Sequence, residues 1–264
     1  MSALELIALI VAGLAAGSIN GAVGSGSLVT LPVLLAMGLE PASAVTTNTI
    51  AMVLSAFGGV LAYRRELTAD LPNLRGLLIT STIGGVVGSA LLLTTPPGAI
   101  RIIVPTLIAF ALLLVIFQPR VAKWVRSRSV STGEAALDPT VNPYDGTSLR
   151  ASIAGCSIYG GYFAAAQGVI LLGVLGAFTG KPMGEVNGVK NLLTLTVNVT
   201  AAVVFTVSHF LGQANVVWSA TAAIALGAAI GGYAGGHLAK RVPPWALRTL
   251  IVIIAATALI RELV

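Results

Sequence analysis

The sequence predicts an all-α polytopic membrane protein with about ten transmembrane segments, arranged as two inverted five-segment repeats with short or re-entrant, glycine-interrupted helices. Three observations support this: an apolar composition, long uncharged runs and an internal repeat. Of the 264 residues, 56% are hydrophobic and 9% are charged, whereas soluble domains carry about 25% charged residues. So few charges cannot cover a water-facing surface, which argues against a soluble enzyme, a disordered chain or a nucleic-acid-binding module.

Uncharged runs divide the chain into segments. The longest cover residues 6–39, 151–180 and 191–239, and a helix needs only about 20 apolar residues to span a bilayer. Glycines and polar residues break each long run, so two of the segments are short. The predicted segments are 3–20, 27–38, 45–62, 76–93 and 102–117, followed by 151–166, 169–179, 190–207, 216–237 and 245–261. Segments 27–38 and 169–179 are either full crossings or re-entrant half-helices.

A hydrophilic stretch, 118–150, separates the two groups of segments and contains eight charged residues and three prolines. We therefore predict a membrane repeat at 1–117, a cytoplasmic linker at 118–150 and a second, inverted repeat at 151–264. With the N-terminus outside, every Lys and Arg except Arg101 and Arg261 falls on the cytoplasmic side, as the positive-inside rule requires. The net charge of +6 then reflects topology and contact with membrane lipid, not binding of nucleic acid.

The internal repeat is visible directly in the sequence. Residues 83–101 and 230–248 are identical at nine of nineteen positions when aligned at a constant offset of 147. Because each repeat holds an odd number of segments, the second copy enters the membrane upside down, as in many secondary transporters. The glycines at 84, 85, 88, 231, 232 and 235 are expected to allow close helix packing.

The candidate binding site lies where glycine-rich breaks precede the two short segments. Ser25, Gly26 and Ser27 precede one of them, and Gln167 and Gly168 occupy the equivalent place 142 residues later. A helix that begins at such a break presents backbone N–H groups and the positive end of its dipole, which suits an anion. The alternative is that these glycines only break the helices.

Polar residues at the start of the next segments complete the candidate site. Thr47 and Asn48 open the third segment, and Lys190 and Asn191 open its counterpart. Polar side chains inside spans are costly and often functional. Lys190 either faces the substrate or snorkels to the cytoplasmic surface, and for Asn198 an interhelical hydrogen bond is the favoured interpretation.

Few residues are available for metal binding or catalysis. The chain has one cysteine, Cys156, and two histidines, His209 and His237, which are too far apart in sequence to indicate a metal site. ATP-binding, zinc-protease and serine-hydrolase motifs are absent. We therefore expect neither an enzyme nor a cofactor.

Several of these motifs resemble the TauE/SafE family of sulfite and organosulfonate exporters over nearly the whole chain. They include the N-terminal GSINGAVGSGSL with Leu31-Pro32, Gly160-Gly161-Tyr162-Phe163, Gln167-Gly168, Lys190-Asn191 and the stretch from Gly231 to Pro243-Pro244. The resemblance implies a bacterial or archaeal inner-membrane transporter, a probable exporter of sulfite, sulfoacetate or related sulfur-containing anions. Many members have glycine where Ser25, Ser27 and Gln167 stand here, which leaves the substrate undefined.

An alternative function is a membrane-embedded accessory protein that hands sulfur or metal species to a partner enzyme through the 118–150 segment. Without an intramembrane carboxylate a proton relay lacks support, whereas a uniporter driven by the membrane potential is compatible. The oligomeric state is open, and a homo-oligomer agrees with the sequence.

Overall fold

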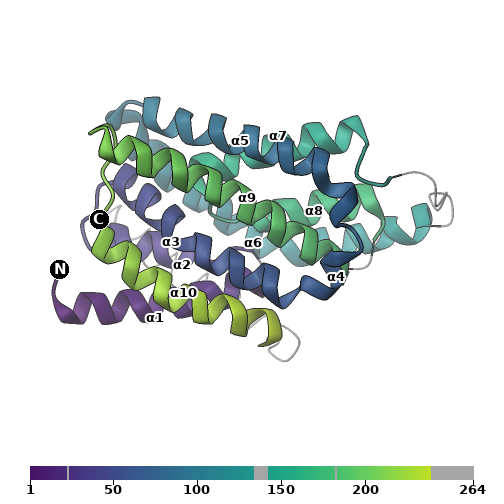
Figure 1. Cartoon of the computed structure of the whole chain (residues 1–264), viewed down its shortest axis with the longest axis horizontal. Coiled ribbons are helices and arrows are strands. Elements are labelled where there is room, and N and C mark those ends of the chain that lie inside the picture. The colour runs from purple at the N-terminus through teal and green to yellow at the C-terminus, as the bar shows by residue number, and fades with distance from the viewer. Residues whose placement is uncertain (23, 134–141, 182, 239–264) are drawn as a thin grey trace.

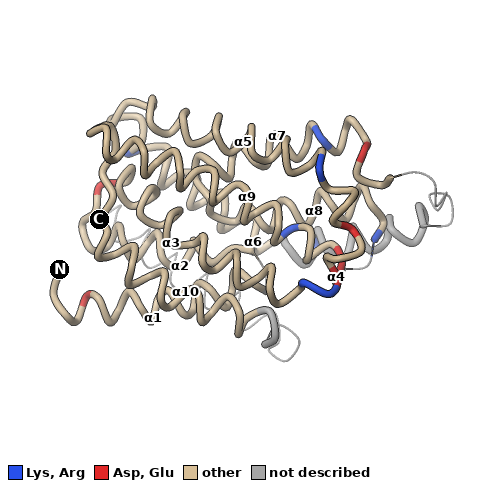
Figure 2. The backbone as a smooth tube through the Cα atoms, in the orientation of Figure 1, with Lys and Arg blue, Asp and Glu red and all other residues tan. Residues whose placement is uncertain are grey.

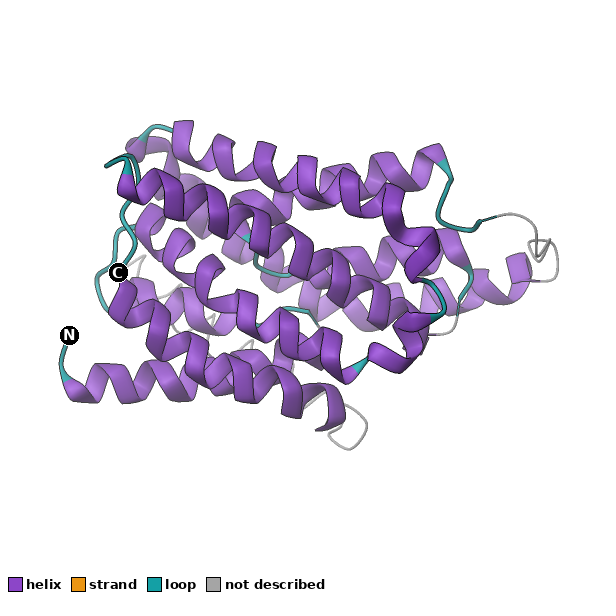
Figure 3. Cartoon of the chain, viewed as in Figure 1, coloured by secondary structure: helices purple, strands orange, loops and turns teal. Residues whose placement is uncertain are grey.

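The computed structural model describes residues 1–22, 24–133, 142–181 and 183–238, and all regular elements in these ranges are helical (Figures 1 and 3). Most of the helices lie side by side along the long axis of the molecule, with connections at its two ends (Figure 1). The elements are α1 (Ala3–Ala22), α2 (Ser27–Ala36), α3 (Pro41–Ala62), α4 (Arg64–Thr68), the 3₁₀ turn η1 (Leu71–Leu74), α5 (Arg75–Thr94), α6 (Pro97–Gly133), α7 (Thr147–Phe163), α8 (Gln167–Thr179), α9 (Met183–Phe210) and α10 (Trp218–Leu238).

Helix lengths bear on how the chain crosses a membrane. In the described part of the chain, five helices (α1, α3, α5, α6 and α9) are long and apolar enough to span a bilayer. The 10 residues of α2 and the 13 residues of α8 extend about 15 and 20 Å, which is less than the roughly 30 Å hydrocarbon core. The re-entrant interpretation is therefore favoured for both. The predicted segment 245–261 lies outside the described residues, and the count of ten stays a prediction.

Two boundaries differ from those predicted by the sequence. Helix α9 starts at Met183 instead of 190, with Glu185 in its first turn, where an acidic side chain stabilises the helix N-terminus. Helix α6 continues to Gly133, so the first part of the 118–150 segment is helix and not loop. Residues 120–132 contain neither glycine nor proline, and the arginines and lysine among them favour helix.

The sides and the ends of the bundle differ in chemistry. Large apolar side chains such as Ile83, Ile102 and Val203 are exposed on its sides, as expected for a surface that faces lipid. Figure 2 shows most Lys and Arg, with several Asp and Glu, at the end of the bundle where α3 and α8 finish. The starts of α1 and α3, near Glu5 and Glu40, lie at the opposite end. We call these the basic end and the acidic end. The positive-inside rule predicts that the basic end is cytoplasmic.

This topology predicts which reagent-accessible cysteines share a side. On a Cys156→Ala background, Ser2→Cys and Glu40→Cys should react with an impermeant maleimide from outside intact cells. Asp145→Cys, at the basic end, should react only after the membrane is opened. All three positions are exposed in the structure. Labelling of Ser2→Cys from the same side as Asp145→Cys would contradict the orientation.

The glycines of the internal repeat lie at close helix contacts, which confirms their packing role. A Cβ atom at Gly84 of α5 would lie 2.6 Å from Ser157 Cβ of α7, and one at Gly231 of α10 would lie 2.9 Å from the backbone nitrogen of Ser18 of α1. Helix α5 packs along α7, and α10 packs along α1. The fourth predicted segment of each half therefore packs on the first helix of the other half.

A buried ionic cluster connects three parts of the chain at the basic end. Asp70, between α4 and η1, accepts hydrogen bonds from Lys181 Nζ at 2.5 Å and from the Tyr144 hydroxyl at 2.8 Å. Lys181 also bonds to Glu185 at 3.2 Å. Burial and the Asp70 carboxylate raise the pKa of the Tyr144 phenol, which therefore stays protonated. The cluster holds the loop before η1 against the α8–α9 connection.

Loss of the Asp70 charge should destabilise the fold. Asp70→Asn removes one partner of a buried ion pair, and hydrogen bonds to a charged group contribute about 2 kcal/mol. Asp145→Asn is the matched control, because the Asp145–Arg150 pair is exposed and such pairs contribute less than about 1 kcal/mol. Thermal unfolding in detergent should show a clear drop for Asp70→Asn alone. Equal unfolding temperatures for the two variants would contradict this account.

Candidate functional site

Two tight turns meet inside the bundle, one between α1 and α2 and one between α7 and α8. We call residues 24–27 and 164–168 the hairpin tips. The Gly168 N–H donates a hydrogen bond to the Gly24 carbonyl at 3.1 Å. A Cβ atom at Gly24 would lie 2.6 Å from Gly168 Cα. Backbones can approach this closely only where both residues are glycine. The two glycine-rich breaks, which are far apart in the sequence, are therefore in direct contact in the fold.

The two tips also share a backbone conformation. Gly24 has φ +83°, and Ala166, which corresponds to it at the offset of 142, has φ +58°. This left-handed region costs a residue with a Cβ roughly 1–2 kcal/mol. Ala164 has φ +62° and ends α7. The second tip therefore holds two strained alanines where glycine would be relaxed.

This strain predicts a stabilising substitution. Ala166→Gly should raise the unfolding temperature, because removal of the Cβ relieves about 1 kcal/mol of strain. Ala165→Gly is the control: Ala165 is equally buried but has no positive φ, so glycine there should lower the unfolding temperature. The prediction fails if both variants are destabilised to the same extent.

The glycines at the tips are less open to a ligand than the sequence suggests. The Gly168 N–H, expected to be available to an anion, bonds to Gly24 instead. A Cβ at Gly26 would meet the Ala16 carbonyl oxygen and lie 2.8 Å from Asn20 Cβ, so Gly26 packs against α1. The dipoles of α2 and α8 still begin at the tips, and the polar side chains there are the groups left to contact a ligand.

All nine residues predicted for the site are buried, and several of their polar atoms lack partners. Within the described residues, no hydrogen bond reaches Ser25 Oγ or either amide atom of Gln167. A buried polar group without a partner costs roughly 1–3 kcal/mol. Such groups at a tip are therefore suited to receive a polar ligand.

On α3, the two predicted residues have different roles. The Thr47 hydroxyl accepts a hydrogen bond from the Val217 N–H at 3.1 Å, so it anchors the connection between α9 and α10. Asn48 Oδ1 accepts a hydrogen bond from the Thr30 hydroxyl of α2. Asn48 Nδ2 has no partner in the described structure and remains able to donate to a ligand.

On α9, Lys190 has no solvent-exposed surface, and its Nζ atom has no hydrogen-bond partner among the described residues. Snorkelling requires the ammonium to reach water, so the structure excludes that interpretation. The sequence left it open because it placed Lys190 at a helix start, whereas α9 begins two turns earlier. Asn191 lies against α3, with Nδ2 3.5 Å from the Gly59 carbonyl oxygen.

Thr194 and Asn198 follow Lys190 at intervals of four residues, so the three side chains share one face of α9. Both are buried, and Thr194 Oγ1 and Asn198 Oδ1 lack partners in the part of the chain described. The amide oxygen of Asn198 therefore does not make the interhelical hydrogen bond that the sequence favoured. The sequence interpretation overlooked Thr194, which the four-residue spacing from Lys190 would have identified.

A series of contacts connects the first hairpin tip to α9. Gly26 packs on Asn20, whose Nδ2 donates to Ser55 Oγ at 3.2 Å. Ser55 lies one helical turn from Gly59 on α3, and Gly59 contacts Asn191. The first tip is therefore connected to Asn191 of α9 through Asn20 and α3. Asn20 and Ser55 are further polar residues of this region that the sequence interpretation did not include.

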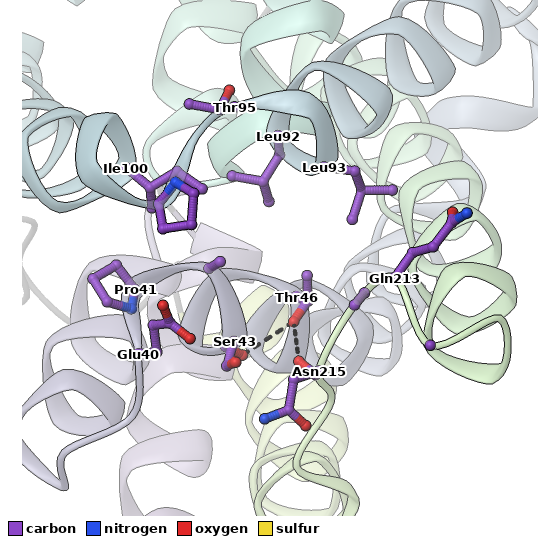
Figure 4. A pocket seen from close by; sticks show the side chains of 14 residues that line it. Glu40, Pro41, Ser43, Thr46, Leu92, Leu93, Thr95, Ile100, Gln213 and Asn215 are labelled. Atoms are coloured by element: carbon purple, nitrogen blue, oxygen red, sulfur yellow. Dashed lines mark hydrogen bonds between the residues drawn. The ribbon is translucent and has the colours of Figure 1, made fainter.

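A cavity of about 370 Å³ opens at the acidic end and contains none of the nine residues (Figure 4). It lies between the start of α3, the α5–α6 connection and the loop before α10. Glu40 and Thr46 line one side, and Leu93 and Gln213 line others. Thr46 bonds to the Asn215 carbonyl oxygen at 2.9 Å and directly precedes Thr47. The cavity thus reaches the start of α3 next to Thr47 and does not include the predicted site residues.

Comparison with known proteins identifies the family. The model of the family named sulfite exporter TauE/SafE matches residues 9–261. The chain belongs to this family. It is therefore a multi-pass membrane transporter and not an enzyme, and the resemblance found in the sequence is confirmed.

Curated relatives of this TauE/SafE protein are similar over almost their full length. The probable membrane transporter protein YfcA of Escherichia coli K12 is 23% identical over 97% of this chain and 88% of its own. The probable membrane transporter protein ORF9 of a Sinorhizobium species is 25% identical over 97% and 91%. A probable membrane transporter protein of Haemophilus influenzae is 22% identical over 96% and 92%. No solved structure is significantly similar to the TauE/SafE chain.

Proposed function

We propose that this TauE/SafE transporter exports small sulfur-containing anions, such as sulfite, sulfoacetate or related organosulfonates, through a site at the meeting point of the two hairpin tips. The observation that carries the proposal is Lys190, a fully buried lysine whose Nζ atom has no partner in the described residues. An unpaired buried ammonium is strongly disfavoured. A bound anion would supply the negative charge that pairs with this ammonium.

The neutral polar groups support the same ligand class. Asn48 Nδ2 and Gln167 Nε2 are donors without acceptors in the described structure, and Ser25 carries an unpartnered hydroxyl. A sulfite or sulfonate group presents three oxygens that accept hydrogen bonds from such donors. We propose that Gln167 and Ser25 contact it at the tips, with Asn48 on α3 or Lys190 and Asn191 on α9 beside it. Asn48 and Gly59, which Asn191 contacts, are eleven residues or about 16 Å apart along α3, so one small anion does not contact both asparagines at once.

The arrangement of the helices supports an inverted-repeat mechanism. Contacts of α5 with α7 match those of α10 with α1, and contacts of α3 with α10 match those of α9 with α5. In the proposed mechanism the two five-segment halves enter the membrane from opposite sides. The short helix of each half begins at its hairpin tip near the midplane, and the halves rock around the tips. The cavity at the acidic end is then the outward vestibule. A membrane potential that is negative inside drives an anion out without a coupling ion.

Binding to purified protein tests the proposal. Sulfite, thiosulfate, sulfoacetate and taurine are each titrated at constant ionic strength while thermal unfolding is followed, since a ligand that binds the folded state raises its stability. At least one of them should stabilise the wild type, and the shift should be reduced in Lys190→Ala. If none of these ligands shifts the wild type while a soluble partner is retained by the 118–150 segment, the accessory-protein alternative is favoured.

A further inference from the structure

The side chain of Gln167 lies against the backbone of the preceding helix, α7. Gln167 opens α8 and is fully buried. If Gly160 of α7 carried a Cβ atom, the three heavy atoms nearest to it would be Cδ, Nε2 and Oε1 of Gln167, all in overlap with it. The amide therefore occupies the space that a side chain at position 160 would fill. Because neither amide atom has a hydrogen-bond partner among the described residues, this contact determines where the amide lies.

The backbone of α7 gives no other reason for a glycine at position 160. Gly160 lies inside the helix and has no positive φ, and glycine destabilises a helix interior relative to alanine. The adjacent Gly161 is explained by helix packing, since a Cβ there would lie 2.6 Å from the Gly85 carbonyl oxygen of α5. At Gly160 the atoms that exclude a Cβ belong instead to a side chain of the proposed site.

The residue before Gly160 holds the backbone of the same turn. The Tyr159 hydroxyl donates a hydrogen bond to the carbonyl oxygen of Ala165 at 2.8 Å. Ala165 is buried between Ala164 and Ala166, the two alanines with positive φ. A strained backbone of this kind persists only where surrounding contacts fix it. The Tyr159 ring is itself held by edge-to-face contacts with two phenylalanines, one on α6 and one on α7.

We propose that Tyr159 and Gly160 are positioning residues that place the Gln167 amide for contact with the transported anion. Tyr159 fixes the turn from which Gln167 projects, and Gly160 leaves the space in which the amide lies. This inference rests on the proposed function, in which Gln167 contacts the anion. It goes further by giving a role in the site to α7, which contains none of the nine predicted site residues. A donor that is already in place loses less side-chain entropy when a ligand binds.

Gly160→Ala separates this role from a structural one. The added methyl group displaces the end of a side chain and no backbone, and alanine favours helix, so the unfolding temperature without ligand should not fall. Sulfite, thiosulfate, sulfoacetate and taurine are titrated by calorimetry at constant ionic strength. Each of them that binds the wild type should bind Gly160→Ala about tenfold more weakly, as expected when a hydrogen bond to a charged ligand is lost.

Gly161→Ala is the matched control, because its Cβ would press on the backbone of α5, and it should lower the unfolding temperature. Wild-type affinity in Gly160→Ala overturns the inference. A fall in unfolding temperature as large as that of Gly161→Ala also overturns it, since the clash would then act on the fold and not on the amide.

A Gln167→Ala background tests whether both residues act through the amide. Without the amide, Gly160→Ala should change affinity by less than about twofold. Tyr159→Phe, which removes only the hydroxyl, should weaken binding in the wild type and should also have less than about a twofold effect in Gln167→Ala. Such non-additivity is expected only for residues that share one interaction. Full, additive losses in the Gln167→Ala background overturn the inference.

The same titrations distinguish failure of the inference from failure of the proposed function. If Gln167→Ala binds these ligands as tightly as the wild type does, Gln167 makes no contact with the anion. The positioning role is then overturned, while anion transport by the protein stands. If none of the four ligands binds the wild type, the proposed function fails and the inference fails with it.

Discussion

Gly168→Val and Gly24→Ala should each abolish anion transport in proteoliposomes while the protein still inserts and purifies. The physical reason is the contact between the hairpin tips. A Cβ at Gly168 would lie 2.5 Å from Gly24 Cα, and one at Gly24 would lie 2.6 Å from Gly168 Cα. Real atoms do not approach so closely, so either side chain drives the tips apart and breaks the Gly168–Gly24 hydrogen bond. Efflux of labelled methanesulfonate or sulfite measures the effect.

The chain offers a matched control for each substitution. Gly38 has φ +84°, like Gly24, but a Cβ there would touch nothing within 4 Å. Gly38→Ala should thus cost about 1–2 kcal/mol of backbone strain and leave transport intact. Gly155 is helical and also open, so Gly155→Val controls for the effect of a valine side chain at a helical glycine. Normal efflux in Gly168→Val would show that the contact between the tips has no part in transport.

Lys190→Met should weaken binding of a sulfur anion by about 10- to 100-fold, the equivalent of about 1.5–3 kcal/mol for a hydrogen bond to a charged group. Methionine keeps most of the buried volume, so the loss reports on charge and not on a cavity. Lys190→Arg should retain part of the affinity because the positive charge remains. Calorimetric titration with methanesulfonate measures all three proteins.

Removal of a surface charge is the control for Lys190→Met. Arg64 is exposed at the basic end, and Arg64→Met should leave affinity within about twofold of the wild type, because exposed charges are screened by salt. If Lys190→Met and the wild type bind methanesulfonate equally, the lysine lies outside the binding site.

Much of the helical plan follows from composition and glycine placement alone. The uncharged runs located each predicted segment that falls in the described residues, because a span of about 20 apolar residues is a strong one-dimensional signal. The offset of 142 also paired the first tip with the second. Helix boundaries were less well predicted, since α9 starts at Met183 and α6 runs to Gly133. Outside the hydrocarbon core, charged residues occur in helices as well as in loops, so a charged stretch does not mark the end of a helix.

What the sequence by itself determined is therefore the membrane class, the helical segments and the residue types available to meet an anion. Only the tertiary structure decided which of them lack partners. It assigned Thr47 to a backbone hydrogen bond and Gly168 to the contact with Gly24, and it left Lys190 Nζ buried without a hydrogen-bond partner among the described residues. The physical reason is that a hydrogen bond or a buried charge depends on atoms from helices far apart in the chain, and no local pattern of residues records those distances.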